Sequence, residues 1–284
     1  IRGAQAFIDS NSNGLLDDGE LSATTGEGGA AQFDITDLNI GSTELSIMVN
    51  VPAGALDEST ITSDNPEGTP VGDGEDFQLM SLPGSNVATP FTTLVALHAM
   101  QSGDVETSKT EVATQLNLTP EQLSSDFIAD DNAVVSVLAE AMIKAKVMPQ
   151  TLPTSVTANE ASTMSLISGA IQSSIASSEN VEADKNKLIQ VAMVYTAASQ
   201  RVLASNESLS HNEIHRVVET ISGLTNHVVA EAGDDSLEDT LVNAEASTMV
   251  AESIITEAIS NNALDENSFV QAQLVAQVVS QTLT

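Results

Sequence analysis

The sequence has no cysteine and no tryptophan, and aromatic residues make up only 2% of it, with a single tyrosine. Without cysteine there is no disulfide framework, no thiolate nucleophile and no cysteine-based zinc site. The scarcity of aromatic rings makes a stacking platform for sugars or bases hard to build, so we expect a core of Ala, Val, Ile, Leu and Met. The missing cysteine and the few aromatic residues therefore argue against proteins that depend on thiol chemistry or on stacking sugars or bases. They do not show whether the protein works in an oxidising or a reducing compartment.

Basic residues are the second scarcity. Eight Lys and Arg residues stand against 40 Asp and Glu residues, which gives a formal net charge of -32. Nucleic acid is excluded as a partner, because binding it requires Lys and Arg to replace the counterions around phosphate. An anionic membrane surface is disfavoured for the same electrostatic reason. A surface of this kind attracts cations.

Long apolar runs are also missing. No stretch approaches the roughly 18 apolar residues of a membrane-spanning helix, so we expect no direct membrane insertion. The first residue is Ile1 rather than Met, which indicates a processed chain or a fragment, and no signal peptide is recognisable. The chain has 284 residues, 41% of them hydrophobic, and this favours one large or two ordinary folded domains.

Residues 1–88 form the first predicted domain. They hold ten or more of the 16 glycines and contain short stretches in which apolar and polar residues alternate. This pattern is typical of strands joined by turns, and short strands with glycine-rich breaks favour a small β-sandwich. The predicted strands are 5–8, 31–35, 44–49 and 76–80.

Residues 89–150 form a predicted helical subdomain. Thr89 followed by Pro90 is a helix start, because threonine caps a helix and proline fits its first position. The same cap and breaker signals define two further helices. The predicted helices run from 89 to about 98–101, from 104 to 116, and from 131 or 132 to before Pro149.

Residues 151–284 are predicted to form a five-helix bundle. Apolar residues recur at helical spacing in five stretches, flanked by start signals such as Ser210 and Ser236 and by short polar connections. Short connections place successive helices side by side in antiparallel order. The sequence therefore predicts an α+β protein, with an N-terminal β-sandwich followed by an all-α helical bundle.

Residues 9–20 match the calcium loop of an EF-hand, which has twelve positions. Calcium takes six to eight hard oxygen ligands, and alternate residues of a tightly wound loop converge on one point. Magnesium requires a smaller and stricter octahedron. Gly14 lies at the sharp turn. The predicted ligands are Asp9, Asn11, Asn13, the carbonyl of Leu15, Asp17 directly or through water, and Glu20 through both of its oxygens.

The alternative interpretation of this loop is a solvated turn, since Asp, Asn and Gly are ordinary turn residues. A turn does not require Glu20 at the twelfth position or the apolar Leu16 at the eighth, so we favour calcium. An EF-hand would also need a helix entering the loop. Residues 1–8 alternate like a strand, which predicts a static site on a β-framework and not a sensor.

The first part of the chain resembles a known family. Ile1 to Asp9, Asn13-Gly14, Asp18-Gly19-Glu20 and residues 23–29 look like the opening of prealbumin-like, calcium-binding β-sandwich repeats in bacterial surface adhesins. The departures are Gly28-Gly29, which replaces the usual turn of the repeat, and the absence of a lipobox cysteine. The resemblance implies a prealbumin-like fold for residues 1–88.

The continuation is similar to large surface or outer-membrane lipoproteins of marine gammaproteobacteria. Pro52-Ala53-Gly54, the acidic stretch 64–70 and the Thr-Pro-Phe-Thr-Thr-Leu-Val segment at 89–95 carry this similarity, which extends over roughly residues 1–130. It implies an exported, surface-associated, calcium-stabilised protein without catalytic activity.

Several weaker candidates have simpler interpretations. An acidic loop can form a second calcium site or remain solvated, and two Asp-Asp pairs before helices are explained by capping. His211 and His215 lie on one helical face, but Glu213 is at the wrong offset for a zinc peptidase, so we expect first-turn surface histidines. The loop carboxylates are Asp64, Glu67, Asp73, Glu75 and Asp76, and the pairs are Asp130-Asp131 and Asp234-Asp235.

The sequence contains no catalytic constellation: neither a G-x-S-x-G elbow, a phosphate loop nor a dinucleotide fingerprint is present. We therefore expect a non-catalytic protein of the cell exterior, such as an adhesin, biofilm-matrix or filament subunit, with calcium and other copies or surface molecules as partners. The alternatives are a cell-surface module that binds acidic polysaccharide or a small solute, and a salt-adapted acidic protein of the cytoplasm.

Overall fold

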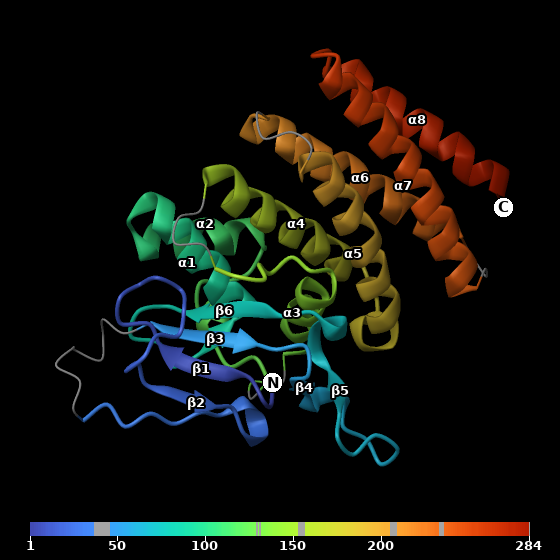
Figure 1. Ribbon diagram of the computed structural model, residues 1–284. Coiled ribbons are helices and arrows are strands. Elements are labelled where there is room, and N and C mark those ends of the chain that lie inside the picture. Colours follow the sequence, from blue (N-terminus) through green and yellow to red (C-terminus); the bar gives the residue numbers. More distant parts are fainter. Residues whose placement is uncertain are drawn as a thin grey trace. The chain divides into compact units, whose positions relative to one another are not determined.

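The computed structural model describes residues 1–36, 46–128, 130, 132–152, 157–204, 209–232 and 236–283 (Figure 1). The chain divides into two compact units. Unit 1 comprises Ile1–Asn132 and Met148–Ala161, and unit 2 comprises Ala133–Val147 and Ser162–Thr284. The chain therefore passes from one unit to the other three times. The predicted domains 1–88, 89–150 and 151–284 stay predictions.

Unit 1 contains a five-stranded antiparallel sheet in the order β2-β1-β3-β6-β7. Two short strands pair separately as β4 and β5. β6 is buried along its whole length, so both faces of the sheet are covered at this strand. The strands are β1 (Gln5–Ile8), β2 (Ser22–Thr24), β3 (Ile47–Val51), β4 (Leu56–Asp57), β5 (Thr69–Pro70), β6 (Phe77–Ser81) and β7 (Ala88–Thr89).

The helix that packs on β6 is α1 (Pro90–Ser102). It begins as predicted: Thr89 Oγ1 accepts from the Thr92 amide, Thr92 Oγ1 accepts from the Thr89 amide, and Pro90 occupies the first turn. Residues 90–97 are all buried. α1 is thus a core helix and not an amphipathic surface helix.

The predicted β-sandwich is wrong. The structure is 59% helical and only 9% strand, and the residues that it describes form one small five-stranded sheet and one two-stranded sheet. A sandwich needs two sheets packed face to face. Here the strands have two to five residues and the apolar helix α1 packs against the main sheet instead.

Three of the four predicted strands overlap observed ones, namely β1, β3 and β6, although residues 44 and 45 lie outside the described part of the chain. The fourth, 31–35, has irregular structure. The predicted second helix is confirmed as α2 (Val105–Gln115), which Asp104 caps. Short 3-10 helices complete unit 1: η1 (Glu27–Gly29), η2 (Glu58–Thr60), η3 (Val71–Gly74) and η4 (Gln122–Ser124).

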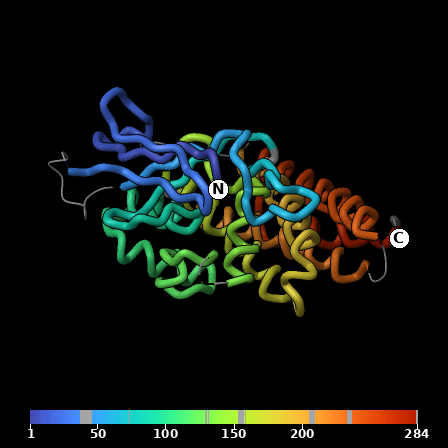
Figure 2. The backbone as a smooth tube through the Cα atoms, turned by 90° about the horizontal axis from the view of Figure 1, so that it is seen from below, coloured from blue at the N-terminus to red at the C-terminus, as the bar shows by residue number. Residues whose placement is uncertain are grey.

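Unit 2 is built from helices that lie side by side (Figures 1 and 2). Ser210 and Ser236 cap α6 and α7, which confirms both predicted starts. Within the bundle α5 packs on α3, α6 and α7, and α8 packs on α7 and α6. The helices are α3 (Ala133–Lys144), α4 (Ala158–Ala176), whose first four residues belong to unit 1, α5 (Val181–Ala204), α6 (His211–Glu231), α7 (Leu237–Ser260) and α8 (Glu266–Leu283).

Small side chains fill much of the interior of unit 2. Ala198, Ala244 and Ala251 are fully buried, and so are the hydroxyl residues Ser199 and Ser247. Small residues let helices approach closely, but they bury less apolar area per residue than Leu or Ile. The bundle is therefore stabilised by many small contacts spread over long helices.

Candidate metal centre

The predicted calcium loop joins two neighbouring strands of the sheet. β1 enters it and β2 leaves it, and the two pair antiparallel with Phe7 opposite Ser22. The Ile8 amide donates to the Leu21 carbonyl at 2.9 Å and closes the base of the loop. Residues 9–20 are thus the connection of a β-hairpin whose first strand also pairs with β3.

Asp9 organises the first half of the loop. Its Oδ1 accepts from the Asn13 amide at 3.1 Å, and its Oδ2 accepts from the Gly14 amide at 2.8 Å. Gly14 has a φ of +75°, and a Cβ there would lie 2.9 Å from the Leu152 carbonyl oxygen. Only glycine fits this turn without strain.

Asn11 and Asn13 turn toward Asp17. Their side-chain oxygens accept from the amides of Asn13 and Leu15 at 3.0 and 2.8 Å. Their side-chain nitrogens donate to the same Asp17 Oδ2 at 2.7 and 2.6 Å. One carboxylate oxygen thus brings together the third, fifth and ninth positions of the loop.

Glu20 closes the ring from the other end. Its Oε1 accepts from the amide and hydroxyl of Ser10 at 2.8 and 2.9 Å, and its Oε2 accepts from the Asp17 amide at 3.1 Å. The hydrogen bonds of Asp9, Asn11, Asn13, Leu15, Asp17 and Glu20 therefore lie within one closed loop. The Leu15 side chain is 53% exposed, so only its backbone serves the loop.

The donor set fits calcium chemically. Calcium prefers carboxylate, amide and backbone oxygens, all of which the loop supplies. The amides of Asn11 and Asn13 point their nitrogens toward Asp17, while their oxygens accept from the backbone amides of Asn13 and Leu15. In the described part of the chain, no three His, Asp or Glu side chains gather as a metal-binding group.

Gln78 connects this loop to the rest of unit 1. Its Nε2 donates to the Gly14 carbonyl at 3.3 Å and to Asn50 Oδ1 at 2.6 Å, while its Oε1 accepts from the Leu152 amide. Its backbone amide donates to the Pro149 carbonyl at 3.0 Å. The sequence analysis missed this residue, and its only signal is a glutamine inside an apolar strand, where a buried amide needs several partners.

The second acidic loop does not form a site in the described residues. Asp76 accepts from the Ala53 amide at 2.8 Å, and Glu67 faces Arg2 at 3.7 Å. These carboxylates serve different partners, and the Asp73 side chain lies outside the described part. The pairs Asp130-Asp131 and Asp234-Asp235 also lie partly or wholly outside it.

The two histidines of α6 point to different partners. His211 Nδ1 lies 2.6 Å from Ser162 Oγ of α4, and His215 lies 3.6 Å from Glu219. The structure therefore does not bring the two imidazoles together on one ligand.

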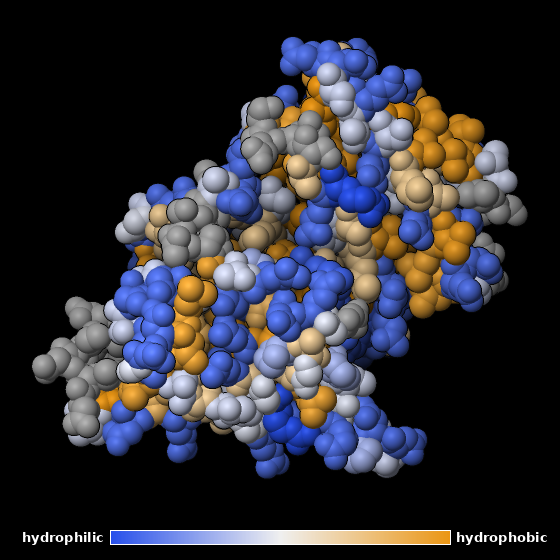
Figure 3. All heavy atoms as spheres, viewed as in Figure 1, coloured by the Kyte–Doolittle hydropathy of each residue, from blue (hydrophilic) through white to orange (hydrophobic). Residues whose placement is uncertain are grey.

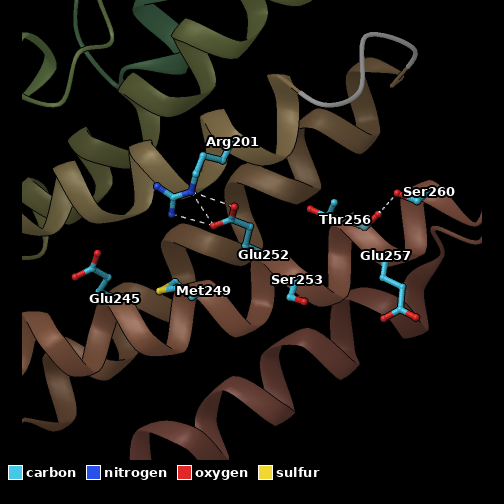
Figure 4. Close-up of a pocket in the computed structure, with 8 residues that line it drawn as sticks. All are labelled: Arg201, Glu245, Met249, Glu252, Ser253, Thr256, Glu257 and Ser260. Atoms are coloured by element: carbon cyan, nitrogen blue, oxygen red, sulfur yellow. Dashed lines mark hydrogen bonds and ion pairs between the residues drawn. The ribbon is translucent and has the colours of Figure 1, made fainter.

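A groove of about 560 Å³ runs along α5 and α7 (Figure 4). The guanidinium of Arg201 forms a two-pronged ion pair with Glu252, with Nε–Oε distances of 3.0 Å, and this pair together with the other charges around it raises the pKa of Arg201. The positive charge of Arg201, the cationic residue in the lining of the groove, is thus already paired with Glu252. The lining residues are Arg201, Glu245, Met249, Glu252, Ser253, Thr256, Glu257 and Ser260.

Comparison of the chain with known protein families, curated proteins and solved structures finds no match. The resemblance to adhesin repeats therefore stays an expectation from the sequence. Among the described helices none is long and apolar enough to span a membrane.

Proposed function

We propose that this chain is a non-catalytic structural protein of the cell exterior, in which residues 9–20 hold one calcium ion that stabilises unit 1. The helical unit supplies contacts between copies. The observation that supports this proposal best is the loop between β1 and β2, in which all six residues predicted to bind the ion take part in hydrogen bonds within the loop.

Each donor has a defined role in the proposal. Asp9, Asn11 and Asn13 bind through side-chain oxygens and Leu15 through its carbonyl. Asp17 binds directly or through water, and Glu20 with both oxygens. The ion would supply two positive charges against the three negative charges of Asp9, Asp17 and Glu20, which reduces their mutual repulsion. Because the ligands are local in sequence, this site forms together with its hairpin.

Gln78 extends the stabilisation beyond the hairpin. Calcium held by Leu15 fixes the neighbouring Gly14, whose carbonyl accepts from Gln78. Gln78 also binds Asn50 on β3 and Leu152 in the segment that returns to unit 1. Ordering the loop therefore favours the docked position of Leu152.

The exterior location rests on calcium supply and charge. Sites of extracellular modules bind calcium with Kd values of about 10⁻⁴ to 10⁻³ M, which cytosolic calcium cannot fill. A net charge of -32 also favours a solution rich in divalent cations. Immunolabelling of intact and permeabilised cells tests the location, and labelling only after permeabilisation contradicts it.

Thermal unfolding with calcium or EGTA tests the calcium site. At a hundredfold excess over Kd, a ligand that binds only the folded state stabilises it by about 2.7 kcal/mol, which corresponds to a rise in Tm of about 5–10 °C for a unit of this size. Glu20→Gln is expected to abolish most of this shift. Asp18→Asn, in the same loop but outside the ligand set, is the matched control.

Isothermal titration calorimetry of the same three proteins gives the stoichiometry. We expect one site in the wild type and in Asp18→Asn, and a large loss of affinity in Glu20→Gln. An unchanged Tm in EGTA, together with no binding heat from millimolar calcium, would refute the proposal.

A further inference from the structure

α8 carries apolar residues on two opposite faces. Phe269, Ala272 and Ala276 are buried in the unit, where α8 packs on α7 and α6. The other face bears Val270, Leu274, Val275 and Val278, which are 44%, 58%, 39% and 59% exposed. Val270, Leu274 and Val278 follow one another at intervals of four residues, so they form a continuous ridge along the helix.

This ridge is part of the main apolar surface of the described residues. Seven of the twelve exposed large hydrophobic side chains belong to α7 or α8. Figure 3 shows apolar residues gathered at the upper right, over the region that Figure 1 labels α7 and α8. A contiguous exposed apolar patch marks an interaction site, whereas single exposed hydrophobic residues do not.

The ridge lies on an electrically neutral helix. From residue 267 to residue 283 the sequence has no ionisable side chain, although the chain as a whole carries a net charge of -32. Glu266, at the start of α8, forms an ion pair with Arg216, whose guanidinium also lies 4.6 Å from the Phe269 ring centre. The one charge on α8 is thus balanced within the unit.

The charge of a partner determines how well it fits the neutral outer face of α8. A basic partner gains most from the carboxylates elsewhere on the chain and nothing from a neutral ridge. Helices that lie on lipid surfaces use Lys, Arg and exposed aromatic residues, which the outer face of α8 lacks. A second copy is repelled by most of the acidic surface but meets no net charge at α8.

We propose that the outer face of α8 pairs with the same face of a second copy. The ridge of Val270, Leu274 and Val278 lies antiparallel against its equivalent, which keeps the two Glu266 residues apart and aligns the helix dipoles favourably. A face that contacts itself gives a two-fold symmetric dimer. This inference rests on the proposed function, in which the helical unit joins copies, and it names the surface.

One helix per copy makes a small interface, below the roughly 1,200 Å² of stable complexes, so the dimer is weak and transient.

The association constant of this dimer should depend on salt in a characteristic way. Salt screens the repulsion between two acidic chains, and raising NaCl from about 0.01 M to about 1 M shortens the Debye length from about 30 Å to about 3 Å. The association constant therefore rises with salt, whereas an interface held by ion pairs weakens.

Sedimentation equilibrium of the full chain over this salt range tests the surface. We expect Leu274→Glu to lower the association constant at high salt by at least tenfold. Ile128→Glu, at a 62% exposed apolar position of unit 1, is the matched control and is expected to leave it unchanged. A wild type that stays monomeric at every salt concentration overturns the proposal, and so does equal dimerisation of both variants.

Cross-linking tests the antiparallel arrangement, because a single introduced cysteine is unique in a chain that has none. Under oxidation we expect Val270→Cys to link with Val278→Cys when the two proteins are mixed, since a disulfide requires Cα atoms within about 7 Å. Links between two copies of Val270→Cys that outnumber the mixed links overturn it. Circular dichroism verifies that each variant is folded.

Two further arms separate this inference from the calcium proposal and from lipid binding. Sedimentation is repeated in calcium and in EGTA: a dimer without a calcium-dependent Tm refutes only the calcium site, and a calcium-dependent Tm without a dimer refutes only the α8 surface. Flotation with phosphatidylcholine vesicles is the second arm. Binding of the wild type that Leu274→Glu abolishes assigns the ridge to lipid and overturns the proposal.

Discussion

Unit 1 and unit 2 are held together in different ways. In unit 1 the strands are short, and single polar side chains such as Gln78, Thr92 and Asp9 connect segments that are distant in sequence or fix tight turns. In unit 2 helices of up to 24 residues pack through many small side chains. Stability is thus concentrated in a few contacts in one unit and distributed along helices in the other. Unit 1 should respond to single substitutions, and unit 2 should tolerate them.

Gly14→Ala gives the largest expected effect. The left-handed φ and the 2.9 Å approach of a Cβ to the Leu152 carbonyl both oppose the substitution, so we expect unit 1 to lose about 2–4 kcal/mol. Hydrogen exchange followed by mass spectrometry measures each unit separately. Gly54→Ala is the control, because nothing lies within 4 Å of a Cβ there. Equal protection of both variants contradicts the role given to Gly14.

Gln78→Leu is expected to rank second. It removes three side-chain hydrogen bonds and leaves unpaired partners at the buried residues Gly14 and Leu152 and at the half-buried Asn50, at a cost of about 2–3 kcal/mol. Faster exchange should appear both in peptides covering 9–20 and in peptides covering 148–152. Gln101→Leu, at an exposed position of α1, is the control. If only the peptides around residue 78 respond, Gln78 does not connect the loop to the returning segment.

Ser199→Ala tests the distributed packing of unit 2, and its expected effect has the opposite sign. Within the described residues, the buried hydroxyls of Thr196, Ser199 and Ser247 have no hydrogen-bond partner. Removing one such group relieves a desolvation cost of about 1 kcal/mol, so urea unfolding monitored on unit 2 should shift to higher concentration. Ser253→Ala, on the exposed side of α7, should have no effect. Destabilisation by Ser199→Ala would show that its hydroxyl has a partner.

The smallest expected effect is the pH response of the α6 cap. The Ser210 hydroxyl and amide both donate to Glu213, and these hydrogen bonds hold the pKa of Glu213 below its usual 4.5. A carboxyl group whose pKa is lower in the folded state stabilises that state above 4.5, and the contribution disappears as the pH falls through the lowered value. Protection at residues 211–216, expressed relative to the intrinsic exchange rate at each pH, should therefore fall in acid.

Glu213→Gln is the reference for this measurement, because many other carboxylates titrate in the same range. The difference in protection between the wild type and this variant, each expressed relative to the intrinsic exchange rate, should shrink as the pH falls below 4.5. A difference that stays constant with pH would show that the Glu213 carboxylate does not stabilise the cap.

Local signals in the sequence were the reliable ones. The helix starts at Thr89, Ser210 and Ser236 depend on residues within four positions, and each is confirmed. The residues predicted to bind calcium in 9–20 are also neighbours in sequence, but the hydrogen bonds between them were not part of the prediction. Whether the loop binds calcium stays a prediction.

Contacts between segments that are distant in sequence could not be predicted from such local signals. Alternation at 31–35 predicted a strand, but irregular structure occupies this segment, and the apolar helix α1 packs on the main sheet in place of a second sheet. In the sequence, Gln78 looks like the exposed polar residue of a strand in which polar and apolar residues alternate. It is buried because Pro149 and Leu152 return from far along the chain, and no local pattern reports that return.

The threefold passage of the chain between the units affects its biosynthesis. α3 is made before residues 148–161 but belongs to unit 2, so neither unit can be completed until the other has begun. A fragment that stops at residue 132 lacks Leu152, the partner of both Gln78 and the Gly14 turn. The nascent protein therefore holds all five strands of the sheet without the Leu152 contact while residues 133–152 emerge, and only then can the hairpin with its acidic loop reach its final stability.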